Sequence, residues 1–278
     1  MPRENIVYFK NQFLNEADCH IPISDRSFRF GDGLFETMLV VAGKIYDFAS
    51  HIERLELGLK NLRIHLASDN LENICNQLIN LNKIQNGCIR IIVSRGSEEG
   101  NNIGYLPKNS QAYFLVQAFE RKYPEFKQVS LFVSSYKNHL NTQAKTNNSL
   151  LYTLAMLEAQ ENNCDNALLI GTDGNICETA SGNIFWIKNN ILYTPSDDSA
   201  IILGTMRKKI ISLWQKEIVT GHFSLQDIIK ADEIFMSNSG VIIAPVTKII
   251  PLGINLSVGI ETKRMRSLLD EDIKNATL

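Results

Sequence analysis

Lys145 lies where a lysine side chain could act as a chemical group. It stands in the polar segment 143–149, directly before an apolar repeat that predicts a helix over 150–162. With Thr146 or Asn147 as the N-cap, the positive end of the helix dipole would disfavour the ammonium form of this lysine. A neutral lysine amine can form a Schiff base with a carbonyl compound. A solvated loop lysine is the simpler alternative.

Glu178 is an acidic residue within an apolar run that predicts a strand. It follows Ile176-Cys and precedes Thr-Ala-Ser-Gly-Asn-Ile-Phe-Trp. A partly buried carboxylate needs a partner, and a protonated pyridine nitrogen would be one such partner. The alternative is a glutamate on an edge strand that faces water.

Two further features could bind an anion. Gly204 precedes a predicted helix that starts near Thr205, so the N–H groups of Thr205 and Met206 would point at a negative group. Arg54 lies at the edge of the apolar stripe of another predicted helix, where it can be partly buried and still reach an anion. An ordinary glycine turn and a surface arginine are the alternatives. Neither GxxxxGK[ST] nor GxGxxG occurs.

The elements that must position these residues mix strands and helices throughout. In the first half, apolar periodicity predicts strands at 5–10, 36–41, 44–48, 88–94 and 111–119, and helices through Ile52–Leu66 and 69–83. In the second half it predicts strands at 129–135, 167–170, 184–188, 191–194 and 233–236, and helices at 150–162, 205–216, 224–230 and from Glu261. We therefore expect an α/β or α+β protein with a domain at 1–120, a linker at 121–128 and a domain at 129–278.

Composition excludes several classes of function. The 278 residues carry 28 Lys and Arg against 30 Asp and Glu, a formal net charge of −2, so nucleic-acid binding is not expected. No apolar run is long enough to cross a bilayer, and the first residues lack the apolar core of a secretory signal. The five cysteines form no CxxC pair, which indicates a reducing cytosol, and we expect no metal site.

Six segments taken together resemble the class IV aminotransferase family, the fold-type IV enzymes that use pyridoxal 5′-phosphate. In chain order they are 25–36 (Asp-Arg-Ser-Phe-Arg-Phe-Gly-Asp-Gly-Leu-Phe-Glu), 51–55 (His-Ile-Glu-Arg-Leu), 145–148 (Lys-Thr-Asn-Asn), 178–185 (Glu-Thr-Ala-Ser-Gly-Asn-Ile-Phe), 203–207 (Leu-Gly-Thr-Met-Arg) and 236–240 (Met-Ser-Asn-Ser-Gly). Each match alone is weak, but six in the right order make the resemblance specific. It covers the chain from about Ser24 to Val246.

The resemblance implies roles for the residues that match. Lys145 would be the Schiff-base lysine and would shuttle protons, and Glu178 would keep the pyridine nitrogen protonated. The cofactor phosphate would be bound by Arg54, the N–H groups of Thr205 and Met206, and Ser239. The family is built of two α/β domains with the cofactor between them, in the D-amino-acid aminotransferase-like fold, and usually forms homodimers.

The choice within the family rests on a few positions. Branched-chain aminotransferases carry a tyrosine where this chain has Leu150, and D-amino-acid aminotransferases carry one where it has Phe35. The segment Ser-Asn-Ser at 237–239 resembles the 4-amino-4-deoxychorismate lyases, in which the asparagine, here Asn238, lies near the substrate. The resemblance therefore favours a lyase that forms 4-aminobenzoate for folate synthesis. An amino-acid aminotransferase is the alternative.

The group that would bind the substrate carboxylate is open at this point. Some lyases place an arginine after a Ser-Arg-Gly sequence, but 97–103 contains none. Arg95, or the loop with Asn101, Asn102 and Tyr105, could take its place. A non-catalytic protein that binds a phosphate ligand on the same fold is a further alternative, although such a protein would need neither the lysine nor the glutamate.

Overall fold

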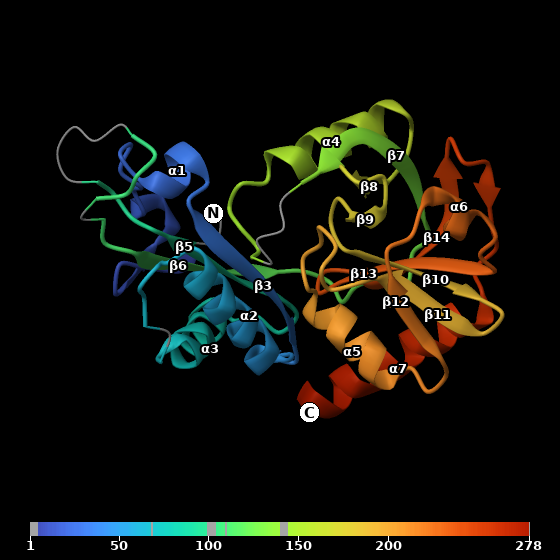
Figure 1. The fold of residues 1–278 in the computed structure, drawn as a ribbon. Coiled ribbons are helices and arrows are strands. Elements are labelled where there is room, and N and C mark those ends of the chain that lie inside the picture. The colour runs from blue at the N-terminus through green and yellow to red at the C-terminus, as the bar shows by residue number, and fades with distance from the viewer. Residues whose placement is uncertain (1–4, 68, 99–103, 109, 140–143, 278) are drawn as a thin grey trace. The chain divides into compact units, whose positions relative to one another are not determined.

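The computed structural model describes residues 5–67, 69–98, 104–108, 110–139 and 144–277 (Figure 1). The chain forms two compact units. The first comprises Met1–Tyr123, Ala144–Ser149 and Ile273–Leu278, and the second comprises Pro124–Gln143 and Leu150–Asp272. The segment 121–128, the predicted linker, contains neither helix nor strand.

The first unit is built on a six-stranded sheet with strand order β2-β1-β6-β5-β3-β4. Its strands are β1 (Ile6–Phe9), β2 (Gln12–Asn15), β3 (Gly33–Val41), β4 (Lys44–Ile45), β5 (Gly87–Ser94) and β6 (Tyr113–Glu120). Its helices are α1 (Arg26–Phe30), α2 (Phe48–Asn61) and α3 (Leu71–Leu81), with a 3-10 turn at Glu16–Asp18. The long central strands β3, β5 and β6 pair antiparallel.

Helices α2 and α3 cover one face of this sheet (Figure 1). Side chains alternate between the two faces of a strand, so Leu34, Met38 and Val40 of β3 all enter the core under the helices. Leu55 of α2 and Leu78 of α3 are buried there as well. The apolar side chains of the strands and of the helices therefore pack together in one core. Glu36 is a charged residue on the same side of β3 as these apolar residues.

The second unit contains a nine-stranded sheet. Eight strands follow the order β12-β11-β10-β13-β14-β7-β8-β9, and the ninth, β15, pairs with β14. Its strands are β7 (Val129–Asn138), β8 (Asn166–Gly171), β9 (Ile176–Thr179), β10 (Asn183–Lys188), β11 (Ile191–Pro195), β12 (Ile218–Gly221), β13 (Glu233–Asn238), β14 (Ile242–Ile250) and β15 (Ile254–Asn255). Its helices are α4 (Leu150–Glu161), α5 (Thr205–Leu213), α6 (Leu225–Ile229) and α7 (Ile260–Thr277), the last of which ends in the first unit.

Strand β8 shows why this sheet is apolar on both faces. Ala167 and Leu169 pack against Ala155 of α4, whereas Leu168 points to the other side, into a core that includes Trp186 of β10. A strand that is covered on both faces reads as a continuous apolar run. Within the described ranges, no helix has the length and apolar character that a membrane crossing requires.

The mixed α/β class predicted from the sequence is confirmed, but two details of the chain division differ. The sequence assigned all of 129–278 to the second domain, whereas 144–149 and 273–278 belong to the first unit. The reason at 144–149 is strand pairing, because the segment bonds to β3. The helix predicted at 205–216 ends at Leu213, where Trp214 turns to an extended conformation.

Candidate active site

Lys145 is fixed against β3 by backbone hydrogen bonds. The N–H of Phe35 donates to the carbonyl of Lys145 over 2.9 Å, and the N–H of Asn147 donates to the carbonyl of Gly33 over 3.0 Å. The Lys145 ammonium nitrogen lies 4.2 Å from the centre of the Phe35 ring. The segment thus continues the sheet for a few residues, and the lysine is half-buried above β3. It is not the solvated loop lysine of the simpler alternative.

The expected helix cap at Thr146 or Asn147 is wrong. Helix α4 begins only at Leu150, five residues after Lys145. Thr146 forms a β-bridge with Leu34, and the Asn147 amide donates to the Ser27 hydroxyl and to a carbonyl of β5. These polar groups attach the lysine segment to the sheet. The positive end of the helix dipole therefore does not lie directly at Lys145.

Gly33 in the first matched segment allows this close attachment. A Cβ at Gly33 would lie 2.0 Å from the carbonyl oxygen of Val93 and 2.5 Å from the Asn147 amide nitrogen. Gly31 has a φ of +67°, and a Cβ there would lie 2.8 Å from Asn148. Both positions therefore exclude other residues, Gly31 also by its left-handed backbone. The Gly-Asp-Gly sequence serves to bring β3 and the lysine segment together.

Arg54 is held by a buried carboxylate that the sequence did not single out. Its Nε donates to Glu36 Oε1 over 2.7 Å and its Nη2 donates to Oε2 over 2.6 Å. His51, one turn earlier on α2, contributes Nδ1 at 2.7 Å from the same Oε2. The Arg54 side chain is only 11% exposed, which rules out an ordinary surface arginine.

The charge of Glu36 is stable because of these two partners. Burial by itself raises the pKa of Glu36, but the positive charge of Arg54 and the hydrogen bonds from His51 and Arg54 outweigh it and lower the pKa to about 2. The carboxylate is therefore ionised at any ordinary pH. It orients the guanidinium of Arg54 by a two-pronged contact of the kind that fixes both distance and angle.

Glu178 lies in β9 of the second unit with 2% of its surface exposed, so the water-facing alternative is wrong. Several donors bond to its carboxylate. The Tyr152 hydroxyl donates to Oε1 over 2.9 Å, the N–H of Ile202 donates to Oε2 over 3.1 Å, and the Asn183 amide lies 3.4 Å from Oε2. A buried carboxylate with several donors is stabilised as the anion.

Asn183 joins this carboxylate to the start of α5. Its amide also donates to the carbonyl of Ile202 over 2.8 Å. Gly204 is the N-cap of α5, and a Cβ there would lie 2.2 Å from Asn183 Oδ1, so only glycine fits. Thr205 and Met206 follow as the first, buried residues of the helix. The first N–H groups of a helix have no acceptor within it and attract anions.

Asn238 shapes the loop that carries Ser239. Its amide donates to the carbonyl of Ser181, and its Oδ1 accepts from the N–H groups of Gly240 and Val241 at 2.7 and 2.8 Å. These contacts bring 236–240 next to 178–183. They use the side chain for backbone support, and the expected substrate contact of Asn238 stays a prediction.

Arg95 is engaged within the first unit. Its Nε donates to Asp32, and its Nη1 and Nη2 donate to the carbonyls of Arg63 and Leu62 at the end of α2. The structure thus gives Arg95 the role of holding α2 to the Gly-Asp-Gly segment, which no sequence pattern indicated. Of the other candidates for a substrate carboxylate, Asn101 and Asn102 lie outside the described residues, and Tyr105 is 85% exposed.

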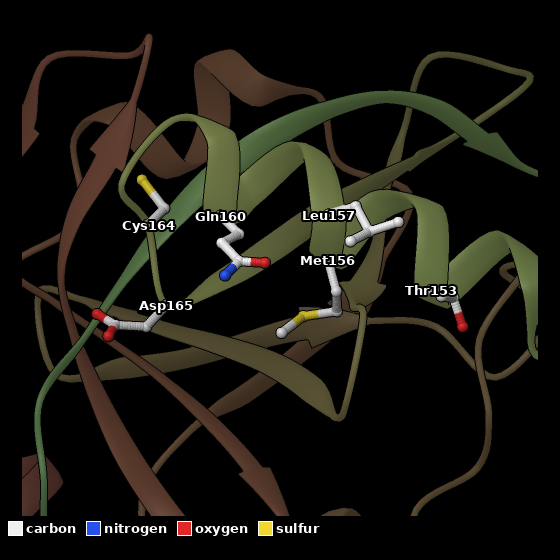
Figure 2. A pocket seen from close by; sticks show the side chains of 6 residues that line it. All are labelled: Thr153, Met156, Leu157, Gln160, Cys164 and Asp165. Atoms are coloured by element: carbon white, nitrogen blue, oxygen red, sulfur yellow. The ribbon is translucent and has the colours of Figure 1, made fainter.

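A cavity of about 310 Å³ lies elsewhere, along the outer side of α4 (Figure 2). It is lined by Thr153, Met156, Leu157, Gln160, Cys164 and Asp165. None of the predicted site residues lines it, so it is separate from the groups described above. In the described part of the chain, no cluster of three or more His, Cys, Asp or Glu could hold a metal ion.

Most of these residues lie within one region that matches a known protein family. The family model of amino-transferase class IV matches residues 33–249, which include Lys145, Arg54, Glu178 and the start of α5. The chain belongs to the class IV aminotransferases. Class IV aminotransferases use pyridoxal 5′-phosphate, so the chain is an enzyme dependent on this cofactor. The alternative of a non-catalytic binding protein is therefore set aside.

Individual class IV aminotransferases with different activities are similarly close to this chain. Aminodeoxychorismate lyase of Bacillus subtilis is 28% identical over 97% of this chain and 95% of its own length. D-alanine aminotransferase of Bacillus licheniformis is 26% identical over 96% and 99%. The structure of the branched-chain amino acid aminotransferase of Escherichia coli matches with a TM-score of 0.90 at 22% identity, covering 99% of this chain and 97% of that one, which shows the fold-type IV fold.

The second unit fits a cofactor with a phosphate group. The N-terminus of α5 has no side-chain cap, and Gly204 leaves its N–H groups uncovered by a Cβ. Ser237, next to the loop of Ser239, is 1% exposed, and its hydroxyl has no hydrogen-bond partner among the described residues. Buried polar groups without a partner are rare, and such a group is suited to bind a ligand or a water molecule.

Proposed function

We propose that this class IV aminotransferase-family enzyme is a 4-amino-4-deoxychorismate lyase, which releases pyruvate and forms 4-aminobenzoate. The observation that carries the choice is Phe35, whose apolar ring lies 4.2 Å from the Lys145 amine, at a position where the resemblance gives D-amino-acid aminotransferases a tyrosine. Leu150, where branched-chain enzymes have a tyrosine, is 64% exposed. The similarity to the Bacillus subtilis lyase over nearly the whole chain supports the same reading.

The resemblance assigns candidate cofactor-binding residues in each unit, taken separately. In the first unit, Lys145 would attach the cofactor and Arg54, oriented by Glu36, would bind its phosphate. In the second, Glu178 would face the ring nitrogen, while the N–H groups of Thr205 and Met206, with Ser239, would bind the phosphate. Bound pyridoxal phosphate supplies an electron-withdrawing ring that stabilises negative charge at the substrate Cα.

The protein's own part in the reaction is to move one proton and to hold charge in place. The Lys145 amine would take the proton from the substrate Cα, acting as a general base. The bond between the substrate ring and the enolpyruvyl oxygen would then break, so that pyruvate leaves and the ring becomes aromatic as 4-aminobenzoate. Glu178, fixed by its donors, would keep the ring nitrogen protonated throughout.

Transamination is the second candidate, and the D-alanine aminotransferase at 26% identity favours it. The reaction would begin with the same loss of the Cα proton to Lys145. It differs afterwards, because the proton is returned to the cofactor and water releases a keto acid. A substrate with a good leaving group beside the reacting carbon favours elimination, so the substrate decides between the two outcomes.

We also propose a cytoplasmic homodimer that serves folate biosynthesis. The free state of all five cysteines supports a reducing compartment. Large apolar side chains remain exposed on the single chain, including Ile23 at 87% and Phe28 at 72%, and a partner subunit would cover such a surface. Light scattering coupled to gel filtration is expected to give about twice the 31.4 kDa chain mass. A monomer at micromolar concentration would contradict the homodimer.

One assay tests the proposed activity. The protein loaded with pyridoxal phosphate is incubated with aminodeoxychorismate, and 4-aminobenzoate and pyruvate are measured. In parallel it is incubated with a panel of L- and D-amino acids and 2-oxoglutarate, and glutamate is measured. We expect 4-aminobenzoate and pyruvate in equal amounts, lost in Lys145→Ala and kept in Lys137→Ala, an exposed lysine of β7. Rapid transamination of leucine, valine or D-alanine without 4-aminobenzoate would contradict the proposal.

A further inference from the structure

Tyr152 bonds to Glu178 from helix α4. It lies in the first turn of α4, two residues after Leu150, and its hydroxyl donates to Glu178 Oε1 over 2.9 Å. Its ring packs with the small core between α4 and β8. The sequence drew attention to position 150 because related enzymes carry a tyrosine there, and the structure brings a different tyrosine of the same helix to the buried carboxylate.

The hydroxyl of Tyr152 is itself held in a defined orientation. The side chain of Asn138 forms a hydrogen bond with it, and the Asn138 amide also donates to the carbonyl of Ala200 over 2.7 Å. Burial and the adjacent carboxylate of Glu178 raise the pKa of Tyr152 well above its usual value. The phenol therefore stays protonated and can only donate its single hydrogen to Glu178 while it accepts one from Asn138.

The two oxygens of Glu178 are bonded differently. Oε2 receives the N–H of Ile202, in the segment before α5, and the more distant amide of Asn183, at the start of β10. The Asn183 amide also donates to the carbonyl of Ile202. Oε1 receives Tyr152. Without the phenol, Oε1 loses this donor and the carboxylate is less restrained in rotation about its last bond. With the phenol, both oxygens are fixed and the plane of the carboxylate is set.

We infer that Tyr152 is a positioning residue that orients the Glu178 carboxylate toward the ring nitrogen of the cofactor. The inference rests on the role proposed above for Glu178. In this role Tyr152 would act through Glu178 and not by its own contact with substrate or phosphate. Its loss is therefore expected to weaken the recognition of a pyridine nitrogen and to leave phosphate binding unchanged.

The test compares two ligands that cannot react with Lys145. 4-Deoxypyridoxine 5′-phosphate has the ring nitrogen and the phosphate but no aldehyde, and benzyl phosphate has the phosphate on a ring without nitrogen. Dissociation constants for both are measured by calorimetry on the full-length chain freed of cofactor. The readout is the ratio of the two constants, which reports the ring nitrogen and cancels general effects on the phosphate site.

Wild type is expected to prefer the pyridine ligand, and Glu178→Gln is expected to lose most of that preference. Tyr152→Phe is expected to reduce the ratio about three- to tenfold, since one donor to the carboxylate is lost, with the benzyl phosphate constant unchanged. Tyr152→Phe added to Glu178→Gln should change the ratio no further. Tyr193→Phe is the matched control, because that ring stacks on Trp186 in the same unit.

Each other outcome overturns the inference in an identifiable way. An unchanged ratio in Tyr152→Phe, with a reduced ratio in Glu178→Gln, removes Tyr152 and leaves the proposed function standing. If Tyr152→Phe raises the dissociation constants of both ligands equally, Tyr152 supports the structure of the site in general and does not orient Glu178. An unchanged ratio in Glu178→Gln removes the role of Glu178 and the inference with it. If Tyr152→Phe does not fold, 3-fluorotyrosine at position 152 keeps the hydroxyl and alters its donor strength, and an unchanged ratio there overturns the inference.

Discussion

Arg54 and Glu36 show how neighbouring residues orient a side chain that is a candidate for the site. An arginine alone is a mobile cation, but the contacts of its Nε and Nη2 with one buried carboxylate set the plane of its guanidinium. Glu36 stands among apolar residues of β3, where an unpaired charge would be costly. The pair therefore stabilises the first unit and orients the group that we propose for the phosphate.

Removal of Arg54 is expected to weaken cofactor binding. A hydrogen bond to a charged group contributes about 1.5–3 kcal/mol, so Arg54→Ala should raise the dissociation constant for pyridoxal phosphate about ten- to a hundredfold. Arg63→Ala serves as a control from the turn that follows α2. Cofactor affinity is measured by fluorescence titration. An Arg54→Ala protein that is folded and binds the cofactor as tightly as wild type would remove Arg54 from the site.

Glu36 gives a prediction about pH. Its pKa is lowered from 4.5 to about 2 in the folded chain, so the contribution of its charge to stability is present above the unfolded value and is lost as the pH falls through the folded one. That contribution is about 3 kcal/mol at neutral pH. Urea unfolding followed by circular dichroism should show Glu36→Gln less stable by about this amount at pH 7, with the difference narrowing from pH 4.5 downward. A difference that stays constant from pH 7 to pH 3 would contradict the ion pair.

Residue types drew attention to Lys145, Glu178 and Arg54, but did not indicate the groups that hold them. The partners of Glu178 come from positions 152, 183 and 202, and the partner of Arg54 is 18 residues away on a strand. Such contacts depend on how a helix faces a strand, which periodicity does not determine. The one signal for Glu36 was its place at the end of the Gly-Asp-Gly-Leu-Phe-Glu segment, on the same strand face as Leu34.

At the scale of elements, short connections carry most of the proposed chemistry. The start of α5, the turn at 180–183 and the loop at 238–240 meet through Asn183 and Asn238. Gly204 lies at the tightest of these contacts, because a Cβ there would press on Asn183 Oδ1. Displacement of Asn183 would affect the first turn of α5 and the donors of Glu178 at the same time.

Gly204→Ala is expected to impair stability and cofactor binding together. A methyl group forced against Asn183 should cost about 1–3 kcal/mol of unfolding free energy, and the dissociation constant for pyridoxal phosphate should rise as the α5 N-terminus shifts. Ser212→Ala, at the exposed far end of α5, is the control. Thermal unfolding and fluorescence titration measure the two effects. An alanine variant with unchanged melting temperature and affinity would contradict the close contact.

Element prediction failed where local patterns conflict with long-range pairing. Strand β14 (Ile242–Ile250) lies inside its sheet although it contains Pro245, a residue that argues against an inner strand. Its apolar run is buried between β13 and β7, and a shift of register before Lys248 accommodates the irregularity. Helices α2 and α3 were predictable because their apolar stripes enter the core. Helix α4 was predictable from the length of its apolar run, although Leu150 and Leu157 of that run are exposed and Ala155 and Ala159 are the buried residues. The short β12 (Ile218–Gly221) offers no such pattern.

At the scale of the whole molecule, the order of motifs was more informative than any single element. Each matched segment has an ordinary structural explanation by itself, and the structure gives some of them, such as the backbone role of Asn238. Their order identified the family before the fold was known, and the family model over 33–249 confirms it. The sequence did not indicate that segment 144–149 belongs to the first unit, because this depends on pairing with a strand more than 100 residues earlier.

The attachment of the cofactor to Lys145 is the claim on which the whole account depends. Lys145 is fixed by backbone bonds to β3 beside Phe35, whereas Lys137 is exposed on β7 and Lys188 ends β10 before a turn. The most direct test is borohydride reduction of the protein loaded with pyridoxal phosphate, followed by protease digestion and mass mapping of the peptides. We predict a pyridoxyl adduct on Lys145 and none on Lys137 or Lys188. An adduct on another lysine, with Lys145 unmodified, would contradict the account.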